Sequence, residues 1–203
     1  MVETFYSFQG GKALKIALDL DGVVANLHDR LVTFFNEKGM HLNDDRYDLS
    51  IRGVKESGDL IQAAIHHIFD QDMSSVQPYE DALFFIKELD RLGPITFPTA
   101  RNPAYNYNTI DWLNKYFDIS FSFTNKSSVD KPKFIKDEGF DVFVEDRLRT
   151  ANHAAALGVP VCLVTRPWNL YRPTHPAVRR VEGLGTVFSL LAAGKFGGDG
   201  DGI

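Results

Sequence analysis

The sequence predicts an α/β domain whose central sheet is mostly parallel. Two observations predict it. Strand-like and helical segments alternate from Pro78 onward, and the first strand-like segment, Leu14 to Leu18, is apolar almost throughout. Such alternation is typical of parallel strands joined by right-handed helical crossovers, and a continuous apolar run is typical of a central strand buried on both faces. In such sheets ligands bind beyond the carboxyl ends of the strands.

Composition and charge narrow the classes of partner. The chain has 203 residues, of which 44% are hydrophobic and 24% charged, and it carries a net charge of -5. A net negative charge is unlike the excess of basic residues that is typical of proteins that bind a nucleic acid polymer. No apolar run is long enough to span a membrane, and the N-terminus lacks the pattern of a signal peptide. We therefore expect a cytoplasmic protein without a membrane partner, whose state as monomer or homodimer stays open.

The first part of the chain holds one strand followed by two helices. A lead-in over residues 1–12 precedes the strand from Leu14 to Leu18. Apolar residues then recur at helical spacing over residues 27–35 and 60–69, whereas residues 40–58 are polar and rich in aspartate, with no clear strand. We expect an all-helical cap over residues 27–77, inserted into a core made of residues 1–26 and 78–203.

Helices and strands alternate regularly in the rest of the core. Gly93-Pro94 ends one helix and Gly158 another, and Cys162 lies within an apolar strand, where a small core side chain is expected. The glycine-rich tail over residues 196–203 is expected to be flexible. The expected helices cover residues 79–92, 105–117, 131–138, 148–157 and 184–193, and the expected strands cover residues 95–97, 119–123, 140–144 and 159–164.

Charged and polar side chains follow three of these strands. Because the carboxyl ends of parallel strands share one edge of the sheet, these side chains are expected to converge in one cleft. Clustered carboxylates repel one another, and a hard cation with oxygen ligands, Mg²⁺, offsets that repulsion and suits a phosphate ligand. The side chains are Asp19 and Asp21 after the first strand, Thr99-Ala100-Arg101 after the second and Glu145-Asp146 after the fourth, with Lys131 at the start of the helix before the fourth.

These residues resemble, in order and spacing, the four motifs of the haloacid dehalogenase-like (HAD) superfamily. The motifs are Asp19-Leu-Asp21-Gly-Val-Val, Thr99, Lys131 and Glu145-Asp146, and they span most of the chain. The resemblance implies a three-layer α/β/α Rossmann-like fold with a small helical cap inserted after the first strand. It also implies a phosphohydrolase that uses Mg²⁺.

The resemblance implies a role for each motif residue. Asp19 would attack phosphorus to form an aspartyl-phosphate, and Asp21 would act as general acid and then as general base. Thr99 and the N–H of Ala100 would bind phosphoryl oxygens, and Lys131 would neutralise charge on the nucleophile and the phosphate. Arg101, which follows them in the sequence, is a further candidate for phosphate binding. Mg²⁺ would be held by Asp19, the carbonyl of Asp21, and Asp146.

A closer likeness is to the 5'(3')-deoxyribonucleotidases, which remove phosphate from nucleoside monophosphates. It is carried by residues 19–26, the short cap, Asp130-Lys131 and the Arg166-Pro-Trp-Asn169 run. It implies a (deoxy)nucleoside monophosphate as substrate, with Phe34, Phe35, Trp168 and Asn169 lining its pocket. The chain departs from that family in having Glu145-Asp146 for Asp-Asp and Thr99-Ala100 for Thr-Ser.

Several alternatives stay open. Asp19 and Asp21 could merely cap the following helix, Lys133 could replace Lys131, and Arg101 could pair with an acid instead of a phosphate. The substrate could be another phosphorylated metabolite such as a sugar phosphate. A non-catalytic module that senses phosphate or binds a partner is a third hypothesis.

Overall fold

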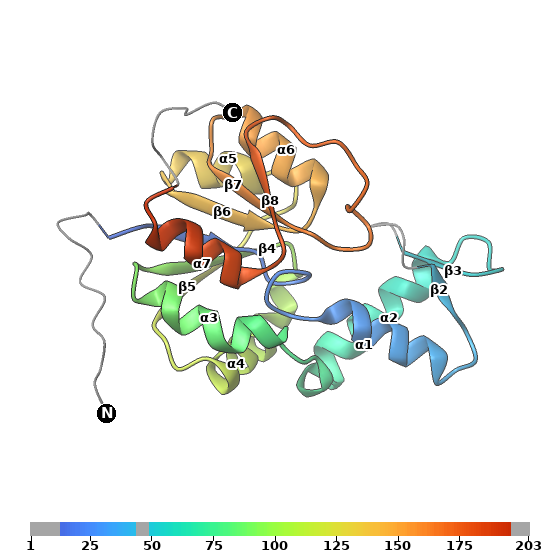
Figure 1. Ribbon diagram of the computed structural model, residues 1–203. Helices are drawn as coiled ribbons and strands as arrows, with labels where there is room; N and C mark the ends of the chain where they lie inside the picture. Colours follow the sequence, from blue (N-terminus) through green and yellow to red (C-terminus); the bar gives the residue numbers. More distant parts are fainter. Residues whose placement is uncertain (1–12, 44–48, 196–203) are drawn as a thin grey trace.

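The computed structural model describes residues 13–43 and 49–195. The lead-in, the acidic residues Asp44, Asp45 and Asp48, and the tail therefore lie outside the described residues. The described chain is built on a six-stranded sheet in the order β5-β4-β1-β6-β7-β8, and every pairing in it is parallel (Figure 1). Its strands are β1 (Ile16–Leu18), β4 (Ile95–Thr99), β5 (Phe121–Asn125), β6 (Val142–Glu145), β7 (Val161–Val164) and β8 (Val178–Val181).

Helices cover both faces of this sheet, which confirms the predicted three-layer α/β/α architecture (Figure 1). Side chains of α3, α4 and α7 share one core with Ile16 and Leu18 of β1, whereas side chains of α5 and α6 share a second core with Ala17. The alternation of Ile16, Ala17 and Leu18 between the two cores is the side-chain period of a strand buried on both faces. The helices are α3 (Glu80–Asp90), α4 (Asn106–Tyr116), α5 (Lys131–Asp137), α6 (Leu148–Ala156) and α7 (Leu184–Ala192), with a 3₁₀ turn η2 (Pro103–Tyr105) before α4.

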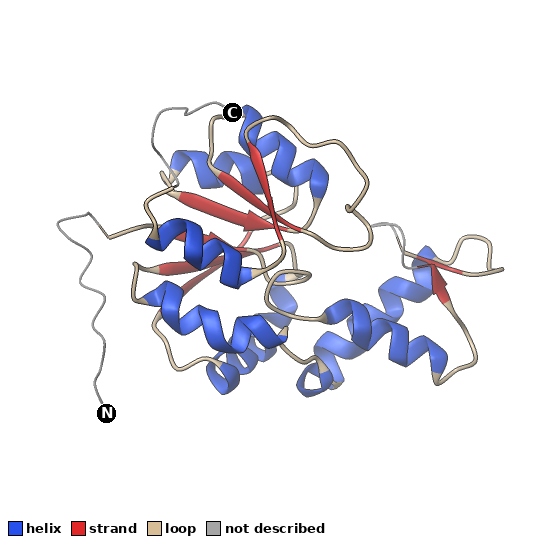
Figure 2. Cartoon of the chain, in the orientation of Figure 1, coloured by secondary structure: helices blue, strands red, loops and turns tan. Residues whose placement is uncertain are grey.

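The cap lies beside the carboxyl-terminal edge of the sheet and consists mainly of two helices (Figure 2). The chain enters and leaves it side by side, because Asn26 N–H donates to Gln77 O at 2.9 Å and Tyr79 N–H donates to Val24 O at 2.9 Å. Its elements are α1 (Leu27–Asn36), β2 (Leu42–Asn43), β3 (Ser50–Ile51), α2 (Gly58–Gln71) and a 3₁₀ turn η1 (Met73–Ser75).

The prediction that residues 40–58 contain no strand was wrong. Strands β2 and β3 pair antiparallel, with Leu42 opposite Ile51, and both of these side chains are buried in the cap. Ser57 Oγ accepts the N–H of Ile51 at 2.9 Å and holds the pair against the start of α2. Strands of two residues carry too little alternation to be recognised in a sequence.

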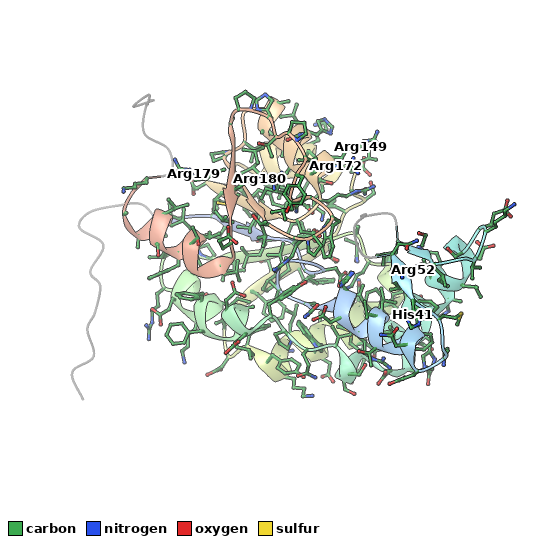
Figure 3. The ribbon with its side chains drawn as sticks, turned by 45° about the vertical axis from the view of Figure 1, so that its right-hand side comes forward. His41, Arg52, Arg149, Arg172, Arg179 and Arg180 are labelled. Atoms are coloured by element: carbon green, nitrogen blue, oxygen red, sulfur yellow. The ribbon has the colours of Figure 1, made fainter. Side chains whose placement is uncertain are left out.

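Strand β8 was also not expected. Its ends, Val178 and Val181, are buried, but its middle residues are Arg179 and Arg180, which conceal the apolar pattern. Figure 3 labels both arginines on β8, together with Arg172 on the segment that precedes it. Among the described residues, no helix combines the length and the apolar character that crossing a membrane requires.

Candidate active site

Three buried carboxylates meet at the carboxyl-terminal edge of the sheet. Strands β1 and β6 are neighbours with Leu18 opposite Val144, so Asp19 and Glu145 leave the sheet side by side and Asp146 follows. Asp19 N–H donates to Val144 O at 2.9 Å and extends the ladder by one residue. One oxygen from each of Asp19, Glu145 and Asp146 lies within 4.8 Å of the others, and we call these three residues the carboxylate cluster.

Lys131 is the cation of this site. Its side chain is buried, and its Nζ lies 2.8 Å from Asp19 Oδ2 and 3.2 Å from Glu145 Oε2. Lys131 is the first residue of α5, and Pro132 follows it at a position that suits the first turn of a helix. Lys133 is exposed and pairs with Asp137 at 2.5 Å on the surface. The geometry therefore favours Lys131 over Lys133 as the lysine of the site.

Burial dominates the electrostatics of the cluster. It raises the pKa of Asp19 to about 8, with the negative charge of Glu145 adding to the rise and Lys131 opposing it. It raises the pKa of Asp146 to about 7, and here the charge of Asp19 adds to the rise. The pKa of Glu145 is raised by burial as well. When all three carboxyl groups are ionised, their negative charge exceeds the single positive charge that Lys131 brings against Asp19 and Glu145.

Glu145 belongs to the carboxylate cluster, although no role of its own was predicted for it from the sequence. It lies in the cluster, whereas the carboxylate of Asp21 does not. Its Oε1 accepts the backbone N–H of Asp146 at 3.3 Å and of Arg147 at 3.0 Å, and its Oε2 faces Lys131. The signal available in the sequence was its place at a strand end, directly before Asp146.

Asp21 pairs with Arg101. Its two oxygens lie 2.6 Å and 2.9 Å from guanidinium nitrogens of Arg101, a bidentate arrangement. The guanidinium also lies 4.3 Å from the centre of the Phe69 ring in the cap. Of the two roles weighed for Arg101, the structure therefore contains the pairing with an acid, while phosphate binding by Arg101 stays a prediction.

The expected phosphate clamp lies at the end of β4. Thr99 is buried, and its Oγ1 accepts the N–H of Arg101 at 3.2 Å. Ala100 is exposed and lines the larger of two cavities at the site. Both residues are thus adjacent to the Asp21–Arg101 pair, and their contact with a phosphoryl group is a prediction.

The turn after β1 holds Asp146 in place. The carbonyl of Leu20 accepts the N–H of Val24 and of Ala25, both at 2.8 Å. Gly22 adopts a φ of 84°, and a Cβ built on it would lie 2.2 Å from Asp146 Oδ2. Glycine is therefore required here both by the backbone conformation and by the close approach of a cluster carboxylate.

The segment after β7 contacts the same carboxylate. Trp168 Nε1–H donates to Asp146 Oδ2 at 3.0 Å, and Asn169 Nδ2 donates to the carbonyls of Asp146 and Val164, both at 2.8 Å. Trp168 lines the smaller cavity, and its contact with a substrate stays a prediction. Asn169 is fully buried and is not among the lining residues, so its role is to hold this segment.

Two cavities open between core and cap. The larger one, about 720 Å³, is lined by Asp19, Lys131 and Glu145 and by polar residues that include Asn102, Asn125 and Ser127. The smaller one, about 390 Å³, reaches Asp21 and Asp146 and extends between α1 and α2. Leu27, Gln62 and Ile65 line both cavities, so the two are adjacent.

The structure places neither Phe34 nor Phe35 at the two described cavities, and a contact of either with a substrate stays a prediction. Phe35 is buried in the main core, and Phe34 packs edge-on against it at 5.4 Å between ring centres. The helical spacing that identified α1 could not tell its buried face from the face toward the cleft.

The cluster suits a divalent cation. Hard cations such as Mg²⁺ take carboxylate oxygens, and ionised carboxylates this close to one another need positive charge beyond that of one lysine. The closeness of the three groups and the raised pKa values of Asp19 and Asp146 are the observations that support this fit.

No family model and no curated protein matches the sequence. Among solved structures, a HAD-like hydrolase from Xanthomonas campestris is similar over 90% of this chain and 96% of its own, with a TM-score of 0.58 and 11% identity. CbbY from Rhodobacter sphaeroides, solved in complex with phosphate, is similar over 87% of this chain and 96% of its own, with a TM-score of 0.55 and 10% identity. A CbbY variant was solved with xylulose 1,5-bisphosphate.

YfnB from Bacillus subtilis, provisionally assigned as a HAD hydrolase, was solved bound to magnesium. It is similar over 89% of this chain and 99% of its own, with a TM-score of 0.57 and 12% identity. At identities this low the likeness concerns the fold. The chain therefore has the α/β fold of the HAD hydrolases.

Proposed function

We propose that this protein is a Mg²⁺-dependent phosphohydrolase that hydrolyses a small phosphate monoester through an aspartyl-phosphate on Asp19. The observation that carries this proposal is the buried Lys131, shared by Asp19 and Glu145 at the wall of the larger cavity. A nucleophilic carboxylate and a phosphate dianion repel each other. Fixed positive charge beside both of them lowers the barrier to their approach.

The residues of the site divide the chemistry between them. An oxygen of Asp19 attacks phosphorus, the bond from phosphorus to the ester oxygen breaks, and Asp21 gives that oxygen a proton. Asp21 then takes a proton from the water that attacks the aspartyl-phosphate, which releases inorganic phosphate and restores Asp19. The cluster would hold Mg²⁺, which when bound supplies charge to offset the phosphoryl oxygens.

Lys131 and Arg101 keep the two acids in distinct environments. Lys131 holds Asp19 Oδ2 at 2.8 Å and so stabilises its ionised, nucleophilic form. Arg101 binds both oxygens of Asp21 and orients that carboxyl toward the cleft between core and cap. Before it can act as the acid, Asp21 must release one of these contacts and take up a proton from solvent at the freed oxygen.

We further propose a (deoxy)nucleoside monophosphate as the substrate. The smaller cavity supports this choice, because its walls include the apolar side chains of Leu27, Leu31 and Ile61 together with the Trp168 ring. A planar base fits such walls, whereas a sugar would lose hydrogen bonds to water there. His28 also lines this cavity, and within the described chain its Nε2 is buried without a hydrogen-bond partner, so a base could supply one.

A sugar phosphate is the second candidate. The polar side chains of Asn102, Asn125 and Ser127 in the larger cavity favour it, because they can pair with sugar hydroxyls. The similar CbbY variant that was solved with xylulose 1,5-bisphosphate supports this candidate.

Release of phosphate from p-nitrophenyl phosphate, with Mg²⁺ and with the metal removed by EDTA, tests the reaction. We expect activity in the wild type that needs Mg²⁺, none in Asp19→Asn, and full activity in Asp137→Asn, which alters a surface acid–lysine pair instead. A wild type as inactive as Asp19→Asn on a broad panel of phosphate esters would favour the non-catalytic hypothesis. A panel of nucleoside monophosphates and sugar phosphates then tests the substrate, and equal rates on both classes would contradict the nucleotide proposal.

A further inference from the structure

We propose that Trp168 is a positioning residue that holds the Asp146 carboxylate so that a single oxygen of it is offered to the cation. This inference rests on the proposed Mg²⁺ site. It begins from the hydrogen bond of 3.0 Å between Trp168 Nε1–H and Asp146 Oδ2, both of which are buried.

The Oδ2 atom of Asp146 has two close neighbours. The indole N–H donates to it at 3.0 Å, and Gly22 lies so near that a Cβ built there would be 2.2 Å from it. An oxygen with these two neighbours has little room for a hydrated cation. Oδ1 is therefore the oxygen with which Asp146 would hold a cation at the cluster.

The segment that carries Trp168 is itself fixed by hydrogen bonds. Arg180 of β8 donates to Asn169 Oδ1 at 3.0 Å and Asn169 O at 2.7 Å, and to Arg172 O at 2.6 Å. Figure 3 shows Arg180 and Arg172 labelled around this segment. From the other end, Arg166 Nε–H donates to Gly22 O at 2.7 Å. The indole is thus presented by a braced loop, a condition for positioning another side chain.

The consequence is a dependence of metal affinity on an indole N–H that does not touch the metal. Partners that orient metal ligands typically contribute 10- to 100-fold to metal affinity. Trp168→Phe keeps an aromatic ring against His28, whose ring centre lies 5.0 Å from that of Trp168, but removes the donor. We therefore expect a rise of about 10- to 100-fold in the Kd for Mg²⁺.

Isothermal titration of the full chain with Mg²⁺ tests this inference, and Trp112→Phe is its matched control. Trp112 is also buried, and its Nε1–H also donates one hydrogen bond, to Val76 O at 2.8 Å away from the cluster. Both variants lose a buried indole donor, so thermal unfolding should show comparable destabilisation. The Kd for Mg²⁺ should rise in Trp168→Phe alone.

The indole N–H resonances give a second readout that needs no substitution at Trp168. The chain has two tryptophans, and the Trp112→Phe spectrum assigns their signals. On addition of Mg²⁺ the Trp168 indole signal should shift and the Trp112 signal should not. Equal Kd values in the two variants, or a Trp168 signal that does not move at saturating Mg²⁺, would overturn the positioning role while leaving the phosphatase proposal intact. A wild type that binds no Mg²⁺ would overturn both.

Discussion

The carboxylate cluster predicts that the protein without metal loses stability as the pH rises. Folding raises the pKa of Asp19 from 3.8 to about 8, mainly by burial and then by the charge of Glu145. Between these two values the folded chain therefore binds more protons than the unfolded chain, and the free energy of unfolding falls with rising pH. A rise of about four units, at about 1.36 kcal/mol per unit, makes this loss on the order of 5 kcal/mol for Asp19.

Mg²⁺ should reverse this loss. A bound cation favours the ionised carboxylates, so the stabilisation by Mg²⁺ should be small near pH 5 and large near pH 8. The pKa of Asp146, raised to about 7, acts in the same direction, but its rise comes partly from the charge of Asp19, so the two losses do not add.

Urea unfolding across this pH range, with EDTA and with Mg²⁺, measures both effects. Asp19→Asn is the control, because an amide does not titrate and the slope with EDTA should become shallower. A free energy of unfolding that stays level or rises between about pH 5 and about pH 8 without metal, relative to Asp19→Asn, would refute this reasoning.

Three further predictions follow from single contacts. Lys131→Met leaves Asp19 and Glu145 without their shared cation, so we expect its free energy of unfolding in urea near neutral pH to fall by about 3–5 kcal/mol. Lys133→Met should change this free energy little. Equal losses in the two variants would contradict the assignment of Lys131. Gly22→Ala forces a Cβ against Asp146 Oδ2, so its melting temperature should fall further than that of Gly53→Ala, whose φ of 77° is similar but whose Cβ position is open; matching melting temperatures would mean that the clash is relieved. Arg101→Lys keeps the charge but loses the bidentate hold on Asp21, so kcat/KM on p-nitrophenyl phosphate should fall at least about tenfold, and unchanged kcat/KM would exclude a role for this pair.

The layers of the fold and the carboxylate cluster could be predicted from the sequence because apolar patterns that run over whole strands and helices specify them. Within residues 13–43 and 49–195, apolar runs and helical spacing identified every strand of the six-stranded sheet except β8, and they identified each of the seven α-helices. Asp19, Glu145 and Asp146 lie together because they follow the carboxyl ends of parallel strands, and these ends share one edge of the sheet. Lys131 was preferred over Lys133 because of the resemblance and because Pro132 follows it. The structure adds a physical reason, since Lys131 is buried between two acids.

The features that could not be predicted depend on tertiary contacts between segments far apart in the chain. The sequence left open that Arg101 pairs with an acid, but nothing in it indicates that this acid is Asp21, 80 positions away. Phe34 and Phe35 are aromatic, as residues that line a pocket often are, yet the packing of α1 places Phe35 in the core. The contact between Trp168 and Asp146 likewise arises from a loop braced by β8, a strand that the sequence concealed.

The most direct test of the proposed chemistry is to look for a phosphoryl group on Asp19. The wild type is mixed with substrate and Mg²⁺, quenched with acid within one turnover, digested, and analysed by mass spectrometry. We predict one phosphoryl adduct on the peptide that contains Asp19, located on that residue and absent from both Asp19→Asn and a sample treated with EDTA. Turnover of the substrate without any adduct on Asp19, or with an adduct on another residue, would contradict the proposal.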